Sequence, residues 1–402
     1  MASLNTTSFT TALKIIYPDS LEEVWFPQSP FMAWVPKSYD FEGASKQSNA
    51  IYSGTRGSAK FSTAINAKST PSFAKFNVTR KKDYAIGSID NEAILASASN
   101  RGAIAKAIKV QVDAAGYEFG RSMAFQAWSD GSGQRGKVSS YAAGVITLTE
   151  RRDTVYFEVG MVLEKKNNAG TLLGGEMTVD AVNIDSGTVT VTLTGGAADP
   201  AANDRLGRSG DFNTGANNSD CFSGVFAWIP VTAPTSTLFY GVDRSLHTTR
   251  LGGGRMTGGA KIIEEIVFDA LARLRTNGGT ADTLWMNSER AAELQKSMQA
   301  KAFVDVMSEG KAKIGLKGFT IVTTSGPITV MDDPNCPYAY GLITKRDCWD
   351  FSTLGDCPHF AEEDGRRFLR ESSSDGVEFR LKYYGNLICQ APVNNMLVDF
   401  DT

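Results

Sequence analysis

Histidine is scarce in this sequence, and the cysteines form no regular pattern. His247 and His359 are the only histidines among 402 residues, which removes most catalytic schemes that depend on an imidazole as general base. The five cysteines are Cys221, Cys336, Cys348, Cys357 and Cys389. An odd number at irregular spacing favours reduced thiols in a cytosolic setting over a disulfide framework.

Long apolar runs are also missing. No stretch of about 20 apolar residues is present, so we expect no membrane span. The first residues show no basic segment followed by an apolar one, so we expect no secretory signal. The formal net charge of −3 does not indicate a dedicated nucleic-acid-binding protein. With 42% hydrophobic and 21% charged residues, the composition is typical of a soluble protein, and the length predicts roughly two or three domains.

The sequence does contain a long amphipathic segment, residues 91–128. Its apolar residues recur at intervals of three or four, which is the period of a helix. They are Ile104, Ile108, Val112, Ala115, Phe119 and Met123. The part after Gly102 alone predicts a helix roughly 40 Å long, at about 1.5 Å per residue. An ordinary long core helix is one explanation, and the segments around it suggest another.

The first 41 residues are predicted to form an extended arm rather than a folded domain. Pro18, Pro27, Pro30 and Pro36 exclude a long helix. Large apolar side chains lie among these prolines, and the candidates for a contact with another subunit are Trp25, Phe26, Phe31 and Trp34. Such side chains on an irregular segment must be buried, either on the body of the same chain or on a neighbour.

Residues 43–82 have an unusual charge composition, with eight basic residues and no Asp or Glu. The basic residues are Lys46, Arg56, Lys60, Lys68, Lys75, Arg80, Lys81 and Lys82. Residues 73–80 alternate as a strand does, with Phe76 and Val78 on one face. We expect a long two-stranded loop that lies over an acidic surface or near phosphate. A solvated loop without a partner is the alternative.

Residues 145–193 favour strands, at 145–149, 155–159, 177–182 and 188–193, and residues 183–187 form a good hairpin turn. This pattern predicts a small antiparallel barrel or sheet.

Residues 260–331 instead predict a compact α+β unit. Its helices span 260–275 and about 288–300, and its strands span 283–286, 319–323 and 328–331. Residues 376–389 then alternate as one long strand, with Val377, Phe379, Leu381 and Tyr383 on one face.

Three local patterns could carry chemistry, and each is weak. Residues 251–259 are glycine-rich before a helix, but they lack the ending of a phosphate-binding loop, so a hinge or crossing point is favoured. Cys336, Cys348, Cys357 and His359 lack the close Cys-x-x-Cys pairs of structural zinc sites. The acidic cluster of Glu362, Glu363 and Asp364 suits a solvated surface, or a contact site for basic residues, better than acid–base catalysis. We therefore predict no catalytic residue, no metal site and no cofactor.

The order of these parts resembles the major capsid protein of tailed bacteriophages, which has the Hong Kong 97 fold. Three further stretches resemble local sequences that are typical of that family. They are 238–244 (LFYGVDR), 284–289 (LWMNSE) and 384–392 (YGNLICQAP). The resemblance implies an α+β fold with these parts: an N-arm (1–42), an E-loop (43–86), a peripheral domain with a spine helix (87–144), a β insertion (145–229), a return to the peripheral domain (230–259), an axial domain (260–337) and returning peripheral strands (338–402).

The function that the resemblance implies is structural. We expect hexamers and pentamers that form an icosahedral shell around viral double-stranded DNA, assembled in the host cytoplasm. The expected partners are other copies of the chain, a separate scaffolding protein, a portal, a decoration protein, and packaged DNA bound without sequence specificity. The predicted intersubunit residues are the four arm aromatics, then Arg56, Lys60, Lys68 and Lys75 of the loop, with Glu362, Glu363 and Asp364 as the surface that receives the loop. A tail or decoration protein, or a cytosolic enzyme, remains the alternative.

Overall fold

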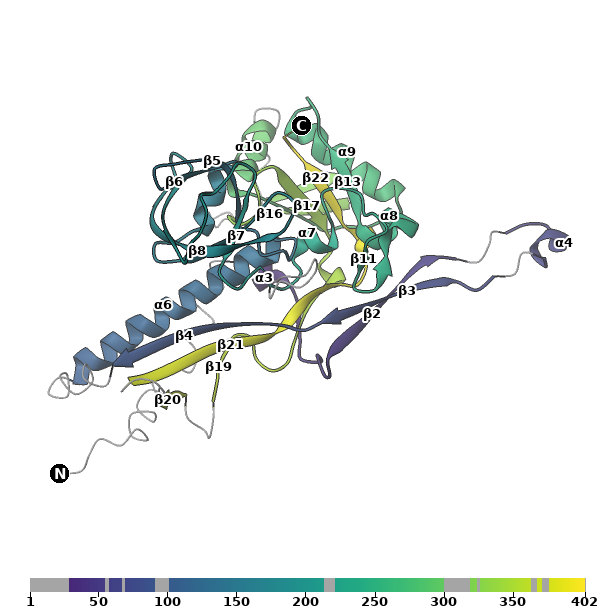
Figure 1. Cartoon of the computed structure of the whole chain (residues 1–402). Coiled ribbons are helices and arrows are strands. Elements are labelled where there is room, and N and C mark those ends of the chain that lie inside the picture. Colours follow the sequence, from purple (N-terminus) through teal and green to yellow (C-terminus); the bar gives the residue numbers. More distant parts are fainter. Residues whose placement is uncertain are drawn as a thin grey trace, which may run out of the picture.

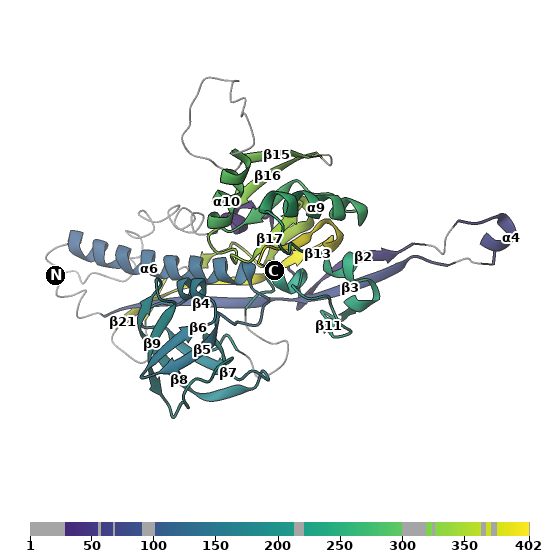
Figure 2. The same ribbon diagram turned by 90° about the horizontal axis from the view of Figure 1, so that it is seen from above.

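A computed structural model of the chain describes residues 29–54, 58–66, 69–90, 101–212, 221–299, 319–323, 326–362, 367–370 and 376–401. The molecule is elongated (Figure 1). A thin hairpin leaves the body at one end, and the long helix α6 and a β-barrel lie toward the other, as the view from above also shows (Figure 2).

The long helix α6 spans Arg101–Trp128, which confirms the predicted helix over that range; residues 91–100 lie outside the described part. Val112, Phe119 and Met123 of the predicted stripe are buried. They face a sheet that contains β4 (Lys81–Asp90) and β21 (Gly376–Cys389), and the Phe119 and Tyr383 rings lie 5.6 Å apart. Burial of this stripe against the sheet stabilises the helix more than its residue propensities do.

The sheet under α6 is built from both ends of the chain. Its order is β1 (Lys37–Ser38), β18 (Trp349–Thr353), β21 and β19 (His359–Phe360), with β4 and β20 (Phe368–Arg370) also paired to β21. Phe379, Leu381 and Tyr383 are buried, as their alternation predicts. β4 pairs with β21 from Asp90 to Lys81. Residues 81–86, which the predicted loop range of 43–86 includes, therefore belong to this sheet.

The predicted two-stranded loop is a hairpin of β2 (Ser45–Ser53) and β3 (Ser72–Thr79), with the short helix α4 (Phe61–Ala64) near its tip. We call residues 45–79 the basic hairpin. Ala74, Phe76 and Val78 on one face of β3 are buried, and the Phe76 ring lies 5.3 Å from that of Trp228. The base of the hairpin is thus anchored in the main core, while its outer part extends away from it (Figure 1).

The predicted β insertion is a closed barrel with the strand order β10-β5-β6-β9-β8-β7. Its strands are β5 (Gly136–Ala142), β6 (Val145–Leu148), β7 (Val162–Lys166), β8 (Leu172–Asn183), β9 (Thr188–Thr194) and β10 (Arg205–Arg208). The barrel begins at Gly136, earlier than the predicted 145, because the short polar sequence of β5 carries little apolar alternation.

One predicted barrel strand is wrong. The pattern predicts an extended segment at residues 155–159, but Arg151–Tyr156 form a 3₁₀ helix, η2. The Glu150 side chain accepts a hydrogen bond from the backbone of Arg152, and the Thr154 hydroxyl donates to the Arg151 carbonyl. Such local side-chain bonds offer the backbone an alternative to a sheet ladder, and the next strand, β7, starts only at Val162.

The α+β unit is a mixed sheet in the order β13-β22-β17-β14-β16-β15. Its strands are β13 (Gly254–Thr257), β14 (Thr283–Met286), β15 (Phe319–Thr323), β16 (Gly326–Asp332), β17 (Tyr340–Thr344) and β22 (Met396–Asp399). Helices α9 (Ile263–Thr276) and α10 (Ser288–Gln299) pack on it. The predicted range of 260–337 is too narrow for this sheet, since β13, β17 and β22 come from outside it.

Short elements connect these layers. They are α3 (Pro30–Trp34), α7 (Val225–Trp228), β11 (Leu238–Phe239), β12 (Val242–Asp243), η3 (Arg244–His247), α8 (Thr248–Gly252), η4 (Arg346–Cys348) and η5 (Pro392–Asn394). The main core joins α6 to the sheet beneath it, to α3 and to Trp285 of the mixed sheet. Within the described residues, no helix is both long enough and apolar enough to cross a membrane.

Candidate functional site

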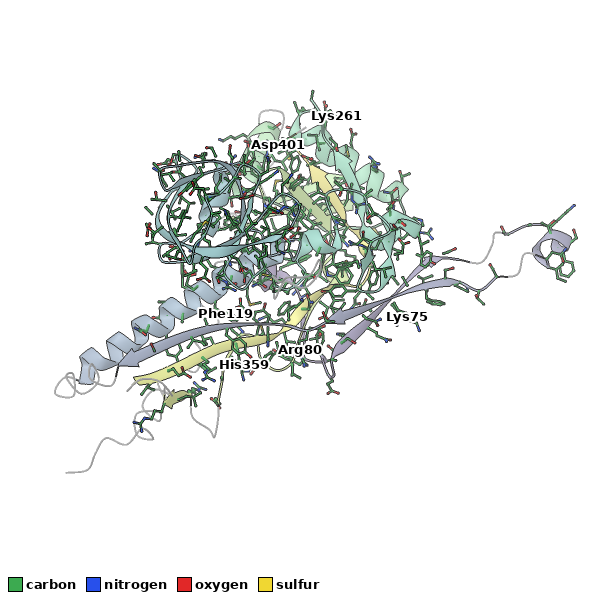
Figure 3. The ribbon with its side chains drawn as sticks, viewed as in Figure 1. Lys75, Arg80, Phe119, Lys261, His359 and Asp401 are labelled. Carbon is green, nitrogen blue, oxygen red and sulfur yellow. The ribbon has the colours of Figure 1, made fainter. Side chains whose placement is uncertain are left out.

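The outer half of the basic hairpin exposes apolar side chains. Phe61 is 81% exposed, Ile51 63% and Phe73 57%. Ile51 and Phe73 are cross-strand partners, so their side chains share one face of the hairpin. A two-stranded hairpin has no second layer of its own, and these side chains have no core of their own to enter. The hairpin therefore presents a surface suited to another molecule (Figure 3).

The basic residues of the hairpin differ in their surroundings. Lys60 and Lys75 are exposed, whereas Arg56 and Lys68 lie outside the described residues. Lys46 is bound within the chain, with Nζ 2.6 Å from Asp40 Oδ1 and 3.1 Å from Asp350 Oδ2. Although burial lowers the pKa of Lys46, its bonds to these carboxylates raise it overall. Lys46 fixes the base of the hairpin, so Lys60 and Lys75 are the described candidates for an outside contact.

The predicted arm contacts require a correction. The side chain of Phe31 is completely buried, with its ring 4.9 Å from that of Trp128 and 5.6 Å from that of Trp285. Trp34 is partly buried against the same core. Of the two alternatives for these aromatics, the structure places Phe31 in the core of its own chain, because Pro30 and the Ser29 cap start a helical turn there. Trp25 and Phe26 lie outside the described residues.

The predicted acidic surface is only partly described. Glu362 is exposed, and its Oε1 accepts from Arg367 Nε at 2.6 Å. Glu363 and Asp364 lie outside the described residues. The ion pair with Arg367 already offsets the charge of Glu362, which weakens this carboxylate as a partner for a lysine of another subunit.

The glycine-rich segment 251–259 is a packed crossing point. Leu251 and Gly252 end α8, and β13 pairs in parallel with β22. Gly253 has a φ of +72°, and a Cβ there would lie 2.8 Å from Ile229 Cδ1. A Cβ at Gly258 would lie closer still to Cδ1 of Ile266. The glycines permit close approach of the backbone to the core, so the segment is neither a phosphate loop nor a flexible hinge.

The cysteines and histidines form no recognisable metal centre. Burial raises the pKa of the thiols of Cys336, Cys348, Cys357 and Cys389. His359 Nδ1 lies 2.6 Å from the carbonyl oxygen of Asp356. No group of three or more His, Cys, Asp or Glu side chains suited to a metal ion occurs within the described ranges. Each thiol is a buried apolar group rather than a ligand.

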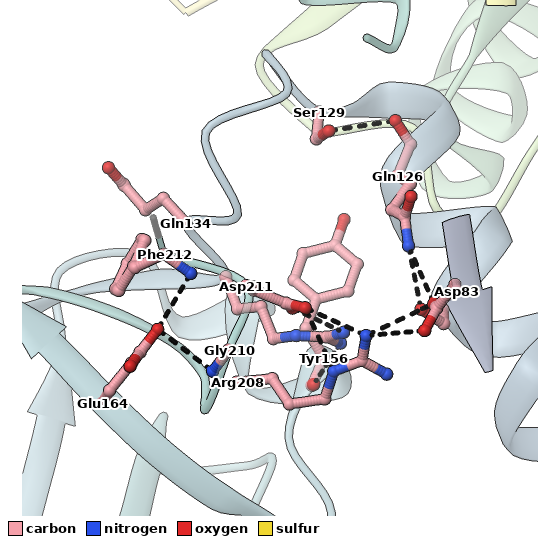
Figure 4. Close-up of polar contacts among 12 residues, drawn as sticks. Asp83, Gln126, Ser129, Gln134, Tyr156, Glu164, Arg208, Gly210, Asp211 and Phe212 are labelled. Carbon is pink, nitrogen blue, oxygen red and sulfur yellow. Dashed lines mark hydrogen bonds and ion pairs between the residues drawn. The ribbon is translucent and has the colours of Figure 1, made fainter. Parts of the chain in front are cut away.

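A buried charge network joins the barrel to α6 and β4 (Figure 4). Arg208 Nη2 of β10 lies 3.2 Å from Asp83 Oδ1 and 2.9 Å from Asp211 Oδ1. Asp83 Oδ2 also accepts from Ser122 Oγ of α6 at 2.9 Å. Burial lowers the pKa of Arg208, but the two carboxylates outweigh it and the pKa is raised. Nothing in the amino-acid pattern indicates this joint, because its members are separated by up to 128 positions in no recognisable motif.

A second joint fixes the barrel to the mixed sheet. The guanidinium of Arg152 in η2 lies 3.6 Å from the Tyr338 ring centre, and that of Arg290 in α10 lies 3.9 Å from it. Arg152 Nη2 also lies 2.7 Å from Glu289 Oε2. Arginine stacks well on aromatic rings and forms forked bonds to carboxylates. The barrel is therefore joined to the rest of the molecule at two points.

Comparison with protein-family models identifies the family of this chain. The family model of the SU10 major capsid protein matches residues 93–367, which is more than half of the chain. The chain belongs to the SU10 major capsid protein family. A comparison with curated proteins finds no match.

The chain is also similar to solved structures. The chain is similar to a subunit of the cyanophage A-1(L) capsid asymmetric unit at 10% identity over 92% of each chain, with a TM-score of 0.53. It is also similar to the capsid of a native GTA particle (12% identity, 92% of this chain and 90% of that chain, TM-score 0.46) and to a chain from Mycobacterium phage Ogopogo (10% identity, 92% of each chain, TM-score 0.44). At these identities the likeness concerns the fold alone.

Membership of the SU10 major capsid protein family confirms the predicted family and fold class. The protein is a structural subunit that forms a viral capsid shell with other copies of itself, and it is not an enzyme. A tail protein, a decoration protein or a cytosolic enzyme is not favoured by these matches. A shell subunit needs extended surfaces that are buried only when copies meet.

Proposed function

We propose that the chain assembles into hexamers and pentamers of an icosahedral shell that encloses a double-stranded DNA genome. The observation that supports this proposal best is the basic hairpin, on which Phe61 is 81% exposed and Phe73 is 57% exposed. Exposed aromatic side chains on a projecting segment are costly in a monomer and favourable at an interface. Each contact is modest, but repetition around a closed ring and across a shell makes the total large.

The parts of the molecule then have the following roles. The basic hairpin acts as the E-loop, α6 is the spine helix of the peripheral domain, the mixed sheet is the axial domain at the centre of each hexamer or pentamer, and the barrel is the β insertion. Residues 1–42 form the N-arm, with Trp25, Phe26 and Trp34 as candidate contacts to a neighbour. Strand β4 serves the peripheral sheet rather than the E-loop, because it pairs along its length with β21.

Several partners belong to the same proposal. A separate scaffolding protein directs assembly in the host cytoplasm, a portal occupies one vertex, and a decoration protein can bind the finished shell. Packaged DNA contacts the inner surface without sequence specificity, which agrees with a formal net charge of only −3. A strongly basic inner surface would instead hold DNA tightly and with a steep dependence on salt.

Reversal of charge on the hairpin tests the proposal. The K60E/K75E variant places carboxylates on a surface that has no Asp or Glu in the wild type. We expect a folded subunit with unchanged circular dichroism that forms far fewer shells than the wild type by electron microscopy. Lys137→Glu on the barrel is the matched control, and we expect it to assemble normally. Normal shells from K60E/K75E would refute the role of the hairpin charges.

A further inference from the structure

Strand β4 divides its side chains between the two faces of the sheet under α6. Asp83 points to α6 and the barrel, because it accepts from Ser122 and pairs with Arg208. Successive side chains of a strand point to opposite faces, so Lys82 and Tyr84 lie on the face turned away from α6. In Figure 1, α6 and the barrel lie above β4 and β21, and this second face lies below them.

The second face is formed by alternate residues of β4 and their partners on β21, and we call it the basic face. It consists of Lys82, Tyr84, Ile86, Ser88, Glu378, Arg380, Lys382 and Tyr384. Glu378 is the one acidic residue of this set, and Arg380 Nε donates to it at 2.9 Å. Neither Lys82 nor Lys382 forms an ion pair within the described part of the chain. These two lysines therefore carry positive charge that no carboxylate offsets.

The two lysines alternate with two tyrosines across the strands. Lys82 lies opposite Tyr384, and Lys382 lies opposite Tyr84, so the lysines are diagonal neighbours, roughly 7–8 Å apart. The tyrosine hydroxyl oxygens lie 2.7 Å apart. Only one of the two hydroxyls donates in that bond, so the hydrogen of the other stays available to an outside acceptor. The four side chains thus offer two cations and a hydroxyl donor on one surface.

The barrel, on the other side of the sheet, has the opposite charge character. Arg151 is the one fully exposed cationic residue among positions 136–208. The fully exposed acidic residues in the same range are Glu150, Glu176, Asp180, Asp185 and Asp199. A polyanion is repelled by such a surface and attracted by the basic face. Charge therefore distinguishes the two sides of the subunit.

We propose that the basic face lines the inside of the shell and binds the phosphate backbone of packaged double-stranded DNA, with the barrel on the outside. This inference rests on the proposed function and names the surface of the subunit that meets the genome. Lys82 and Lys382 neutralise phosphates, and the Tyr84–Tyr384 pair donates a hydrogen bond to a phosphate oxygen. Such contacts carry no sequence information. Two lysines per subunit bind weakly, and salt lowers the affinity, but the contact is repeated over the whole shell.

Formaldehyde crosslinking of DNA-filled shells tests the contact. The reagent joins a lysine amine to the amino group of a nearby base, and mass spectrometry after nuclease and protease digestion locates the lysines that carry nucleotides. We expect adducts on Lys82 and Lys382. Lys137 of the barrel is the matched control, because it is half-buried like Lys382, and it should carry none. Empty shells treated in the same way give the background.

Charge reversal gives an independent readout. K82E/K382E places carboxylates on the basic face, so we expect a normal yield of empty shells and a smaller fraction of shells that contain DNA. Lys137→Glu should change neither quantity. A normal fraction of filled shells from K82E/K382E would overturn the proposal.

The crosslinking result separates this proposal from the proposed function. Adducts on Lys137 in place of Lys82 and Lys382, or DNA-filled shells with adducts on none of the three lysines, would overturn the proposal and leave the proposed function intact. A wild-type protein that forms no DNA-filled shells would overturn both.

Discussion

Arg208 on the barrel and Asp83 on β4 form an ion pair, with Nη2 3.2 Å from each carboxylate oxygen. The pair ties an inserted domain to the sheet beneath the long helix. Asp83 also accepts hydrogen bonds from Ser122 and Gln126 of α6, so three layers meet at one carboxylate. These bonds link the barrel directly to α6 and β4.

Loss of the Arg208 side chain should destabilise the subunit. In Arg208→Met, the carboxylates of Asp83 and Asp211 stay largely buried without this cation. Removal of one partner from a buried pair costs about 3–5 kcal/mol, and since the Arg208 side chain is 32% exposed, we expect a loss of about 2–3 kcal/mol. Thermal or urea unfolding measures it. Arg205→Met on the same strand is the control, and an equal effect of both variants would contradict the role of the joint.

Phe31 and Phe61 should separate folding from assembly. Phe31 is fully buried and Phe61 is 81% exposed. Truncation of a buried phenylalanine costs about 3–5 kcal/mol, so Phe31→Ala should unfold at markedly lower denaturant. Phe61→Ala should unfold like the wild type and yet form fewer shells. If Phe31→Ala kept full stability and lost only assembly, the placement of Phe31 in the subunit core would be wrong.

Asp153 should make the stability of the subunit depend on pH. Burial, reinforced by Glu150, raises the pKa of Asp153 to about 7, whereas an unperturbed aspartate titrates at about 3.9. Between these values the folded state binds more protons than the unfolded state, so this group lowers stability as pH rises. Asp153→Asn should therefore stabilise the subunit at pH 8 and have little effect at pH 4. Asp185→Asn, on an exposed turn, is the control for melting curves at both pH values.

Gly253 should tolerate no side chain. Its φ of +72° is unfavourable for alanine, and a Cβ would lie 2.8 Å from Ile229. We expect Gly253→Ala to lower the free energy of unfolding by about 1–2 kcal/mol through backbone strain. Overpacking against Ile229 should lower it by about 1–3 kcal/mol more. Gly160 has a φ of +87° and no heavy atom within 4 Å of an added Cβ. Gly160→Ala should therefore lose only the backbone contribution to the free energy of unfolding. Equal losses in the two variants would mean that a methyl group at position 253 fits without a clash.

Strong periodicity predicted the elements that bury one face. Phe119 and Met123 marked α6, Phe379 and Tyr383 marked β21, and the turn at 183–187 marked the β8–β9 hairpin. These patterns are local, and burial follows them directly. The 3₁₀ helix at Arg151–Tyr156 was missed because capping bonds outweighed the strand propensity of its residues.

Tertiary pairings could not be predicted in the same way. Nothing in residues 81–90 shows that β4 leaves the hairpin to pair with β21, almost 300 positions away. The mixed sheet likewise takes β22 from the far end of the chain.

The most direct test of the whole account is electron microscopy of the purified protein, combined with light scattering, with and without its proposed scaffolding protein. The account predicts closed shells of uniform diameter built from hexamers and pentamers, in which the basic hairpin of each subunit lies on its neighbour. A protein that remains monomeric under all these conditions would contradict it.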